Sequence, residues 1–362
     1  MSLVKHWSAL LDDYVIDLAW SPDGSLLAAA AQSGKMMIYD AATGAVTHSL
    51  AGHEDGTNCL AWMPGVSGQQ SAVSSRSLAT GGQDGFVRFW DATAGRQTAE
   101  AKLGTAWVEH LAWSFSPTQP SIPGSQLLFA AAGKSLVGLS PDGATAHTFP
   151  AAPKTITALA VSSPATLDSQ RSTLSSQPCL SAAYFGGVCT WNAETFVAVK
   201  EYPYGNTIHA LVWSPDGRWL VAGCQDNAVH LWVPAQDDEF HMSGYETKLK
   251  ELSFSHDSKW LATGGGRDAC VWDCTGKGPE GREPLLLPHS ARVCAVAFQN
   301  RHGRLATGSA DGVFTLWDPG RKNPMIAEAR MPSAVTKFAW SPDDSLLAVG
   351  TEQGPLFVFK VV

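Results

Sequence analysis

The sequence is poor in charge, and poorest in positive charge. Charged residues make up 16% of its 362 residues, and 25 Lys and Arg stand against 33 Asp and Glu, which gives a formal net charge of −8. A chain with this balance lacks the basic surplus that attracts nucleic acids or anionic membranes. We therefore expect neither as a general partner, whereas basic protein partners stay open.

The chain also lacks a cysteine framework and a long apolar run. Its seven cysteines are an odd number scattered along the sequence, unlike the dense pattern that crosslinks small secreted domains. Lys5, Asp12 and Asp13 interrupt the first twenty residues, so these residues do not resemble a signal peptide, and no apolar run is long enough to span a bilayer. These absences predict a soluble protein of the cytosol.

What the chain does contain is a repeat. Hydrophobic residues make up 44% and glycines number 34, which is enough apolar material for a large core and too much for a disordered chain. An apolar segment that usually ends in an aromatic residue recurs eight times, with 41 to 52 residues between the ends of neighbouring copies. The copies are residues 15–20, 57–62, 108–113, 156–161, 208–213, 249–254, 293–298 and 335–340.

Each copy continues with further short apolar segments rather than helices. Second segments such as 26–30 and 78–81 are followed by a Gly or Asp turn, and third segments such as 86–90 and 313–317 alternate apolar and polar residues and end in Trp. These are signals of β-strands and tight turns, and helical periodicity is nowhere sustained. A single unit of this kind cannot bury both its faces, so the copies are expected to stack radially and protect their edges.

Several dipeptides in register with this repeat resemble those of a known family. They are Trp90-Asp91, Trp272-Asp273 and Trp317-Asp318, the near-variants Tyr39-Asp40 and Trp191-Asn192, and the pair Gly52-His53. Together with the turns at 21–24 and 214–217, they make the chain similar to WD-repeat β-propellers over essentially its whole length. The resemblance implies an all-β fold, a single closed β-propeller domain of four-stranded blades that spans residues 1–362.

Counting copies predicts eight blades, with seven as the alternative if the third or fourth copy is irregular. The eighth copy has only three strands, and residues 1–10 are expected to supply its outer strand and so close the ring. Three insertions rich in Ser, Gln and Pro, at 64–77, 116–126 and 162–178, are expected to cluster on one sector of one face. The blades are predicted to begin near residues 14, 56, 107, 155, 207, 248, 292 and 334.

The resemblance also implies a buried hydrogen-bonded tetrad in two copies. Its members are His53, Thr80, Asp84 and Trp90 in the second copy, and His289, Thr307, Asp311 and Trp317 in the seventh. A hydroxyl, an imidazole and a carboxylate also invite comparison with a hydrolase, but a hydroxyl that bonds a buried Trp is no exposed nucleophile. The role is therefore predicted to be structural. Copies with Ala29, Ala222 or Val349 at the Thr position, and the sixth copy with its shortened glycine turn, are expected to rely on packing.

Function is expected where loops from many blades meet. In the family, the residues before each first strand, and those before the turn Asp, surround the channel mouth and meet peptides. The matching positions here are Tyr14, Trp107, Lys248, Arg292, Gln83, Gln225 and Arg267, and they include the residue types that dominate interface energy. The leading prediction is a non-catalytic protein–protein interaction scaffold without a cofactor, a monomeric propeller within a larger complex.

Polar residues one position further along the first strands raise an alternative. These are Asn58, Glu109, Thr157, His209, Lys250, Cys294 and Thr336. If they line a wet channel, Glu109, His110, His209 and Cys294 are the candidates for binding a metal or small ligand, or for catalysis. No pair of closely spaced metal-ligand residues accompanies them, so a metal or ligand site is the alternative and the scaffold is the leading prediction.

Overall fold

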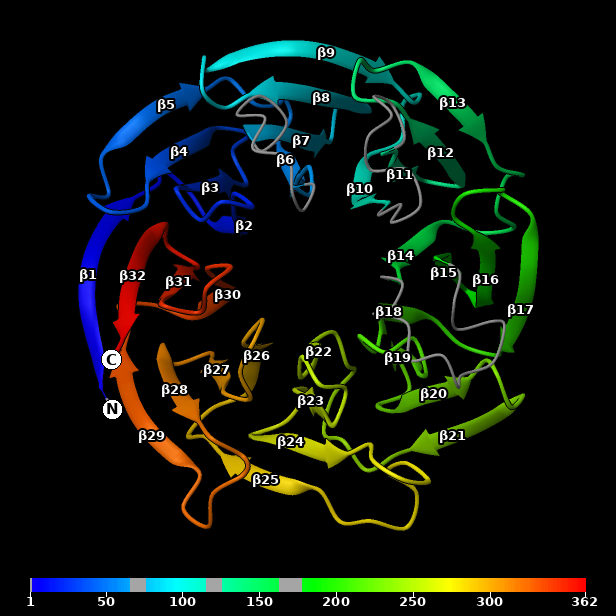
Figure 1. Cartoon of the computed structure of the whole chain (residues 1–362), viewed down its shortest axis with the longest axis vertical. Helices are drawn as coiled ribbons and strands as arrows, with labels where there is room; N and C mark the ends of the chain where they lie inside the picture. The colour runs from blue at the N-terminus through cyan, green and yellow to red at the C-terminus, as the bar shows by residue number, and fades with distance from the viewer. Residues whose placement is uncertain (1, 66–75, 115–125, 163–177) are drawn as a thin grey trace.

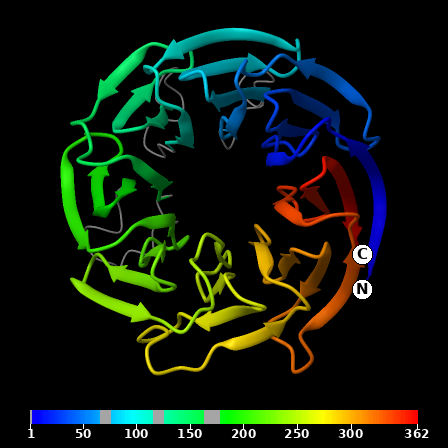
Figure 2. The same cartoon turned by 180° about the vertical axis from the view of Figure 1, so that it is seen from behind.

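The computed structural model describes residues 2–65, 76–114, 126–162 and 178–362. These described residues form eight four-stranded antiparallel sheets, arranged as blades in one ring around a common axis (Figures 1 and 2). The all-β class and the eight-bladed count are thereby confirmed against the seven-bladed alternative. The three Ser-, Gln- and Pro-rich insertions lie mostly outside the described residues, and so does their expected clustering.

Each blade runs from an inner strand near the axis to an outer strand at the rim. Blades one to four comprise β2 (Val15–Trp20), β3 (Leu26–Ala31), β4 (Met36–Asp40) and β5 (Val46–Leu50); β6 (Thr57–Trp62), β7 (Ser77–Gly82), β8 (Phe86–Asp91) and β9 (Arg96–Lys102); β10 (Val108–Trp113), β11 (Leu128–Ala132), β12 (Ser135–Leu139) and β13 (Thr145–Thr148); and β14 (Ile156–Val161), β15 (Cys179–Tyr184), β16 (Gly186–Asn192) and β17 (Ala198–Tyr204). Blades five to eight comprise β18 (Ile208–Trp213), β19 (Leu220–Cys224), β20 (Val229–Val233) and β21 (Asp238–Met242); β22 (Leu252–Phe254), β23 (Trp260–Thr263), β24 (Asp268–Asp273) and β25 (Leu285–Pro288); β26 (Val293–Phe298), β27 (Leu305–Ser309), β28 (Val313–Trp317) and β29 (Met325–Arg330); and β30 (Val335–Trp340), β31 (Leu346–Thr351), β32 (Pro355–Val361) and β1 (Leu3–Leu10).

A β-bulge interrupts the start of most inner strands. In blade one, Val15 pairs with Ala31 and Asp17 pairs with Ala30, so Ile16 has no partner in the ladder. The same skip occurs in blades two, three, four, five, seven and eight among the described pairings. Because a bulge shifts the alternation by one residue, Val15 can be buried together with Leu18 and Trp20. The skipped residues in the other six blades are Asn58, Glu109, Thr157, His209, Cys294 and Thr336.

Blade six departs from this plan, and the first-strand prediction for residues 249–254 is wrong in its first half. The inner strand β22 begins only at Leu252. Ahead of it, the Thr247 N–H donates to the carbonyl of Gly265, which lies in the shortened glycine turn with a φ of 88°. Leu249 donates its backbone N–H to the Cys224 carbonyl of blade five and is buried without belonging to a strand.

The two ends of the chain close the ring, as predicted. Strand β1 is antiparallel to β32, with Leu3 opposite Val361 and Leu10 opposite Pro355, and Figure 1 shows both termini on blade eight. Trp7 in β1 is 8% exposed, its indole N–H donates to the Ala41 carbonyl at 2.9 Å, and its ring centroid lies 5.5 Å from that of Tyr39 in blade one. The N-terminal strand therefore binds both its own blade and the next.

Neighbouring blades are joined by the tryptophans that end the inner strands. The Trp62 indole N–H donates to the carbonyl of Ala19 in blade one at 2.9 Å, and that of Trp113 donates to the carbonyl of Ala61 in blade two at 3.1 Å. Trp20 and Trp340 make the same bond to Ala339 and Ala297. Each acceptor is the residue just before the terminal aromatic of the preceding inner strand, so the repeated aromatic links one blade to the next.

We expect Trp113→Phe to destabilise the protein by about 1–2 kcal/mol, because an aromatic ring is kept while the partly buried Ala61 carbonyl loses its donor. The midpoint of urea denaturation, followed by circular dichroism, measures the effect. Trp107→Phe is the control, because that side chain is 52% exposed. Equal midpoints for the two variants would mean that the indole bonds contribute nothing to holding the blades together.

Glycines let the blades approach closely. A Cβ on Gly81 would lie 2.6 Å from Cγ1 of Val108, and one on Gly308 would lie 2.6 Å from Cγ1 of Val335. In both cases the valine is the first inner-strand residue of the following blade, and Gly350 faces Val15 in the same way. None of the described segments forms a helix long and apolar enough to cross a membrane.

Candidate binding site on the mouth face

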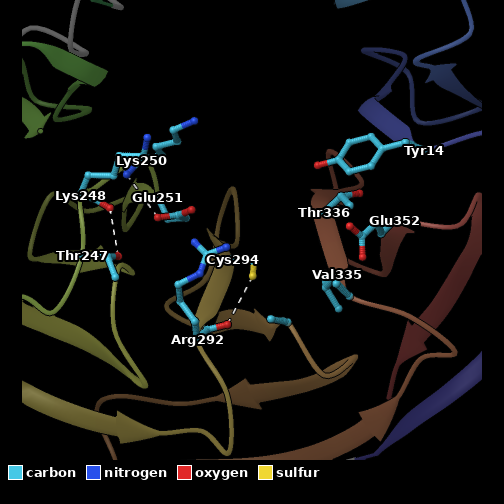
Figure 3. A pocket seen from close by; sticks show the side chains of 12 residues that line it. Tyr14, Thr247, Lys248, Lys250, Glu251, Arg292, Cys294, Val335, Thr336 and Glu352 are labelled. Atoms are coloured by element: carbon cyan, nitrogen blue, oxygen red, sulfur yellow. Dashed lines mark hydrogen bonds between the residues drawn. The ribbon is translucent and has the colours of Figure 1, made fainter.

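The loops that lead into the inner strands lie on one face of the ring, together with those that join second and third strands; we call it the mouth face. A hollow of about 580 Å³ on this face, the mouth pocket, is lined by residues of blades six, seven, eight and one (Figure 3). It brings together three residues that the sequence places before inner strands: Tyr14, Lys248 and Arg292. Positions that are far apart in the chain thus share one concave surface.

A repeated backbone bond fixes the positions of Tyr14 and Arg292. The N–H of the residue that follows the second strand donates to the carbonyl of the residue that precedes the inner strand of the same blade. Gln32 donates to Tyr14, Ala310 to Arg292 and Glu352 to Ala334, at 2.9 to 3.0 Å. Gln83 and Gln225 make the same bond to Gly56 and Thr207. The rim of the mouth face is therefore held by main-chain bonds that do not depend on side-chain identity.

Opposite ends of the mouth pocket differ in charge. Lys248, Lys250 and Arg292 lie at the end formed by blades six and seven, whereas Tyr14 and Glu352 lie at the end formed by blades one and eight (Figure 3). Burial, and secondarily the Glu352 carboxylate, raises the pKa of the Tyr14 hydroxyl, which therefore stays protonated at neutral pH. The pocket thus offers three cationic groups, a neutral phenol and a carboxylate.

Two further groups of the pocket are turned toward the protein. Glu251 accepts a hydrogen bond from the Lys250 backbone N–H at 3.2 Å and lies against Gly264 of its own blade. Burial raises the pKa of the Glu251 carboxyl. The Cys294 thiol donates to the Arg292 carbonyl at 3.3 Å, and burial raises its pKa, so it is no reactive thiolate.

The other four predicted contact residues lie elsewhere on the mouth face and do not line the mouth pocket. Trp107 precedes β10 in blade three and is 52% exposed. The Gln83 side chain donates to Asn58 at 3.4 Å, and the Gln225 side chain lies 2.6 Å from His209 Nε2. Arg267 is exposed, and its carbonyl accepts the His289 backbone N–H. The seven candidates therefore divide into a group of three and four separate positions.

Sequence reasoning did not select Glu352. This residue follows the second strand of blade eight directly, as Gln83 and Gln225 follow theirs. The positional rule that selected the two glutamines applies equally to Glu352, so the signal was present. The rule was tied to a turn Asp, which blade eight lacks because Gln353 stands there.

An ion pair between inner strands joins the blades on either side of the ring closure. Lys337 of blade eight lies 2.9 Å from the Asp17 carboxylate of blade one, which also accepts the Leu60 backbone N–H of blade two at 3.1 Å. The Asp17 carboxylate raises the pKa of Lys337. The two side chains neutralise each other's charge, so we assign this pair a role in stabilising the ring.

The candidates for a metal or ligand site in the channel are not brought together. Glu109 and His110 belong to blade three, His209 to blade five and Cys294 to blade seven. Within the described residues, no group of three or more His, Cys, Asp or Glu side chains is arranged to hold a metal ion. Burial lowers the pKa of His110 to about 4, so this imidazole is neutral at pH 7.

The tetrad residues of blade two form one continuous chain of hydrogen bonds. The Trp90 indole donates to Thr80 Oγ1, and the Thr80 hydroxyl donates to His53 Nε2, both at 2.9 Å. Since a carboxylate only accepts, His53 Nδ1 carries the proton and donates it to Asp84 at 2.9 Å. Thr80 is fully buried and His53 is 2% exposed, so the hydroxyl cannot meet a substrate.

Blade seven keeps only part of this arrangement. Trp317 donates to Thr307, and Thr307 bonds His289, but the Asp311 carboxylate accepts from Ser290 and Ser309 instead of from the imidazole. The reason lies two residues after the Thr. In blade two that position is Gly82, where a Cβ would lie 2.1 Å from Cγ of the His53 ring. Ser309 occupies the equivalent position in blade seven, so its side chain excludes the same imidazole placement.

In the fifth and sixth copies, tyrosine stands at the position of the tetrad histidine. Tyr245 stands four residues before Leu249; its hydroxyl accepts the Trp272 indole N–H at 2.8 Å and bonds Thr263 at 3.0 Å. Tyr204 stands four residues before Ile208 and donates to Asp226 at 2.9 Å.

We expect Asp311→Ala to cost about 1–3 kcal/mol at neutral pH, because the buried Ser309 hydroxyl and the exposed Ser290 hydroxyl lose a charged acceptor. Hydrogen bonds from Ser290 and Ser309 lower the Asp311 pKa to about 2. Because this folded-state pKa lies below the unfolded value of about 4, the contribution is present above about pH 4 and is lost toward pH 2. Urea denaturation of both proteins across this range should show the difference shrinking. Asp238→Asn is the control, and a difference that does not change with pH would contradict the assignment.

Comparison with family models places the repeat in a known group. The model described as "WD domain, G-beta repeat" matches residues 44–91, 198–233, 239–273 and 283–318. A second model, "Anaphase-promoting complex subunit 4 WD40 domain", matches residues 4–64. The matched segments fall mainly on blades one, two, five, six and seven, with the outer strands of blades four and eight, and they include the Trp-Asp dipeptides at 90, 272 and 317.

Curated relatives are distant and longer than this chain. "WD repeat-containing protein srw1" of Schizosaccharomyces pombe is 27% identical over 176 residues, which is 47% of this chain and 31% of the relative. "Anaphase-promoting complex subunit cdc20" of Dictyostelium discoideum is 25% identical over 174 residues, which is 45% of this chain and 34% of the relative. Each match thus covers about a third of the relative's length.

Solved structures share the fold. The Dos1 propeller superposes with a TM-score of 0.80 at 18% identity, covering 99% of this chain and 95% of that one. The computationally designed Ika8 protein superposes with a TM-score of 0.76 at 18% identity, covering 99% and 100%. At this level of identity the likeness concerns the architecture alone.

Proposed function

The chain belongs to the WD-repeat β-propeller family, and from that premise we propose that it is a non-catalytic scaffold that binds a protein partner at its mouth pocket. The observation that carries the proposal is the concave surface of about 580 Å³ to which four blades contribute. Its rim is held by main-chain bonds, so it is formed before a partner arrives, which lowers the entropic cost of binding.

The composition of the pocket fits a protein partner. Tyr and Arg supply most of the energy in protein interfaces, and Tyr14 and Arg292 face the same hollow. The tetrads are enclosed, and the channel residues with catalytic side chains are spread over three blades. We therefore propose binding rather than catalysis as the activity of this propeller, without a cofactor.

The comparisons support a role within a larger assembly. One of the matching family models and the Dictyostelium discoideum relative are named for the anaphase-promoting complex. We propose that this chain likewise acts as a propeller subunit of a multiprotein complex, in a reducing compartment such as the cytosol. Six cysteines support that compartment because they are free thiols: Cys59, Cys189, Cys224, Cys270, Cys274 and Cys294.

Capture of the partner from native extract tests the proposal. Tagged wild-type protein, the double variant Tyr14→Ala/Arg292→Ala and the control Trp107→Ala are compared by quantitative mass spectrometry. A partner that uses the mouth pocket should be recovered about tenfold less with the double variant, since the two lost anchors together cost about 1.4 kcal/mol or more. A partner recovered equally with all three proteins would place its site elsewhere.

A further inference from the structure

The strongest unexplained feature of the mouth face is a group of cations without internal partners. Lys248, Lys250, Arg267 and Arg292 are exposed side chains of blades six and seven, and none of the four forms an ion pair within the described part of the chain. Other cations do: Arg88 lies 2.7 Å from Asp84, and Lys337 lies 2.9 Å from Asp17. In a chain with a net charge of −8, three of these cations, Lys248, Lys250 and Arg292, share the mouth pocket, and Arg267 lies outside it.

The carboxylates of the pocket balance only part of this positive charge. Glu251 lines the pocket and interacts electrostatically with Lys250 and Arg292, but burial raises the pKa of its carboxyl. Glu352 lies at the far end of the pocket, beside Tyr14 (Figure 3). A ligand in the hollow therefore meets cations at one end and a phenol and a carboxylate at the other.

We propose that the mouth pocket binds an acidic peptide segment, with its Asp or Glu side chains placed on Lys248, Lys250 and Arg292. This inference rests on the proposed function and names the chemistry of the partner. Charge complementarity carries it: opposite charges steer the encounter and fix the register of the peptide, while like charges reject other partners. The sequence alone left basic partners open, and the mouth pocket favours the opposite sign.

The same face argues that the acidic ligand is short. Asp12, Asp13, Glu54 and Asp55 are exposed in the loops that lead into the inner strands of blades one and two. This acidic sector would repel an extended polyanion such as a nucleic acid that crossed the face, because each phosphate there would meet a like charge. A peptide with a few carboxylates confined to blades six and seven avoids that repulsion.

Calorimetric titration with a synthetic peptide of alternating Glu and Ser tests the inference; the peptide with Gln in place of Glu is the reference ligand. Lys248→Glu/Arg292→Glu should weaken binding of the Glu peptide by about tenfold or more. The matched control is Lys277→Glu/Lys322→Glu, which makes the same change of charge in loops on the opposite face of blades six and seven and should leave affinity unchanged. Circular dichroism checks that each variant is folded.

Glu352→Lys tests the inference with the opposite change of charge. Because this change removes the one carboxylate at the far end of the pocket and adds a cation, it should tighten binding of the Glu peptide several-fold and increase its salt dependence. Weaker binding after Glu352→Lys would overturn the inference, since it would mean that Glu352 accepts a group from the ligand. Equal affinity for the Gln peptide, or binding only of a phosphoserine peptide, would overturn it as well.

The two proposals fail in different ways. If a captured partner depends on Tyr14 and Arg292 while the Glu peptide does not bind, the scaffold role stands and the acidic class of partner is wrong. If the Glu peptide binds through Lys248 and Arg292 while capture yields no protein that depends on them, the chemistry of the pocket stands and the scaffold role is wrong.

Discussion

Removing residues 2–10 should abolish the stable fold, with the free energy of unfolding lowered by about 5 kcal/mol or more. Loss of Trp7 alone should lower the free energy of unfolding by about 3–5 kcal/mol, because it is a buried aromatic side chain. The truncation also removes the whole β1–β32 ladder. A protein of this kind has a total stability of about 5–15 kcal/mol, so the loss is comparable with the whole.

Thermal melting and light scattering measure the outcome. The truncated protein should melt well below the parent and aggregate, because β32 becomes an unpaired edge strand with alternating apolar residues. Trp7→Ala in the full chain should produce an intermediate loss, and a peptide of residues 2–10 added in excess should restore part of the lost stability. A truncated protein that melts like the parent would show that blade eight does not need its fourth strand.

The closed ring was predictable because it depends on quantities that a sequence states directly. Strand number, turn residues and the missing fourth strand of the last copy follow from spacing and polarity. The irregularities of the inner strands were not predictable in the same way. The bulge at Ile16 becomes visible only when Val15, Leu18 and Trp20 are all found buried, since each alternation taken alone looks regular.

The candidate site was predictable in position but not in composition. The rule that residues before inner strands face the mouth located Tyr14, Lys248 and Arg292, because most blades make the same turn there and the altered turn of blade six keeps Lys248 on that face. Which of those positions share a hollow depends on side-chain size and on the irregular start of blade six, where Lys250 and Glu251 leave the strand. Such departures arise from three-dimensional competition between backbone bonds, which spacing does not record.

The tetrads show the same limit at the level of one atom. A sequence match gives His289 and Asp311 the same spacing as His53 and Asp84, yet only the second blade joins the two side chains. The deciding residue is Ser309, which stands where blade two has Gly82. The tyrosines Tyr204 and Tyr245 were not predicted, because the family pattern has histidine at this position. A phenol hydroxyl can form hydrogen bonds there as well.

Thr80→Val should cost about 2–4 kcal/mol at nearly constant volume, because it leaves two buried groups without a hydrogen-bond partner. Each unsatisfied group costs about 1–3 kcal/mol. The Trp90 indole N–H loses its acceptor and His53 Nε2 loses its donor. Urea denaturation followed by circular dichroism measures the change. Val349 occupies the same position in blade eight without an accompanying histidine, so valine itself is compatible with this place in a blade.

A double-mutant cycle separates the loss of hydrogen bonds from the loss of packing. Trp90→Phe removes the indole donor that Thr80→Val leaves unsatisfied. The double variant Thr80→Val/Trp90→Phe should therefore be less destabilised than the sum of the two single changes, by about 1 kcal/mol or more. Thr307→Val with Trp317→Phe repeats the cycle in blade seven, where the same Trp–Thr bond is 2.6 Å. Strict additivity in both blades would mean that the tetrad hydroxyls contribute only volume. The expected coupling would instead explain why blades one and eight lack both the Thr and the His. A buried polar network stabilises the fold when every member has a hydrogen-bond partner, and an apolar core is more stable than an incomplete network.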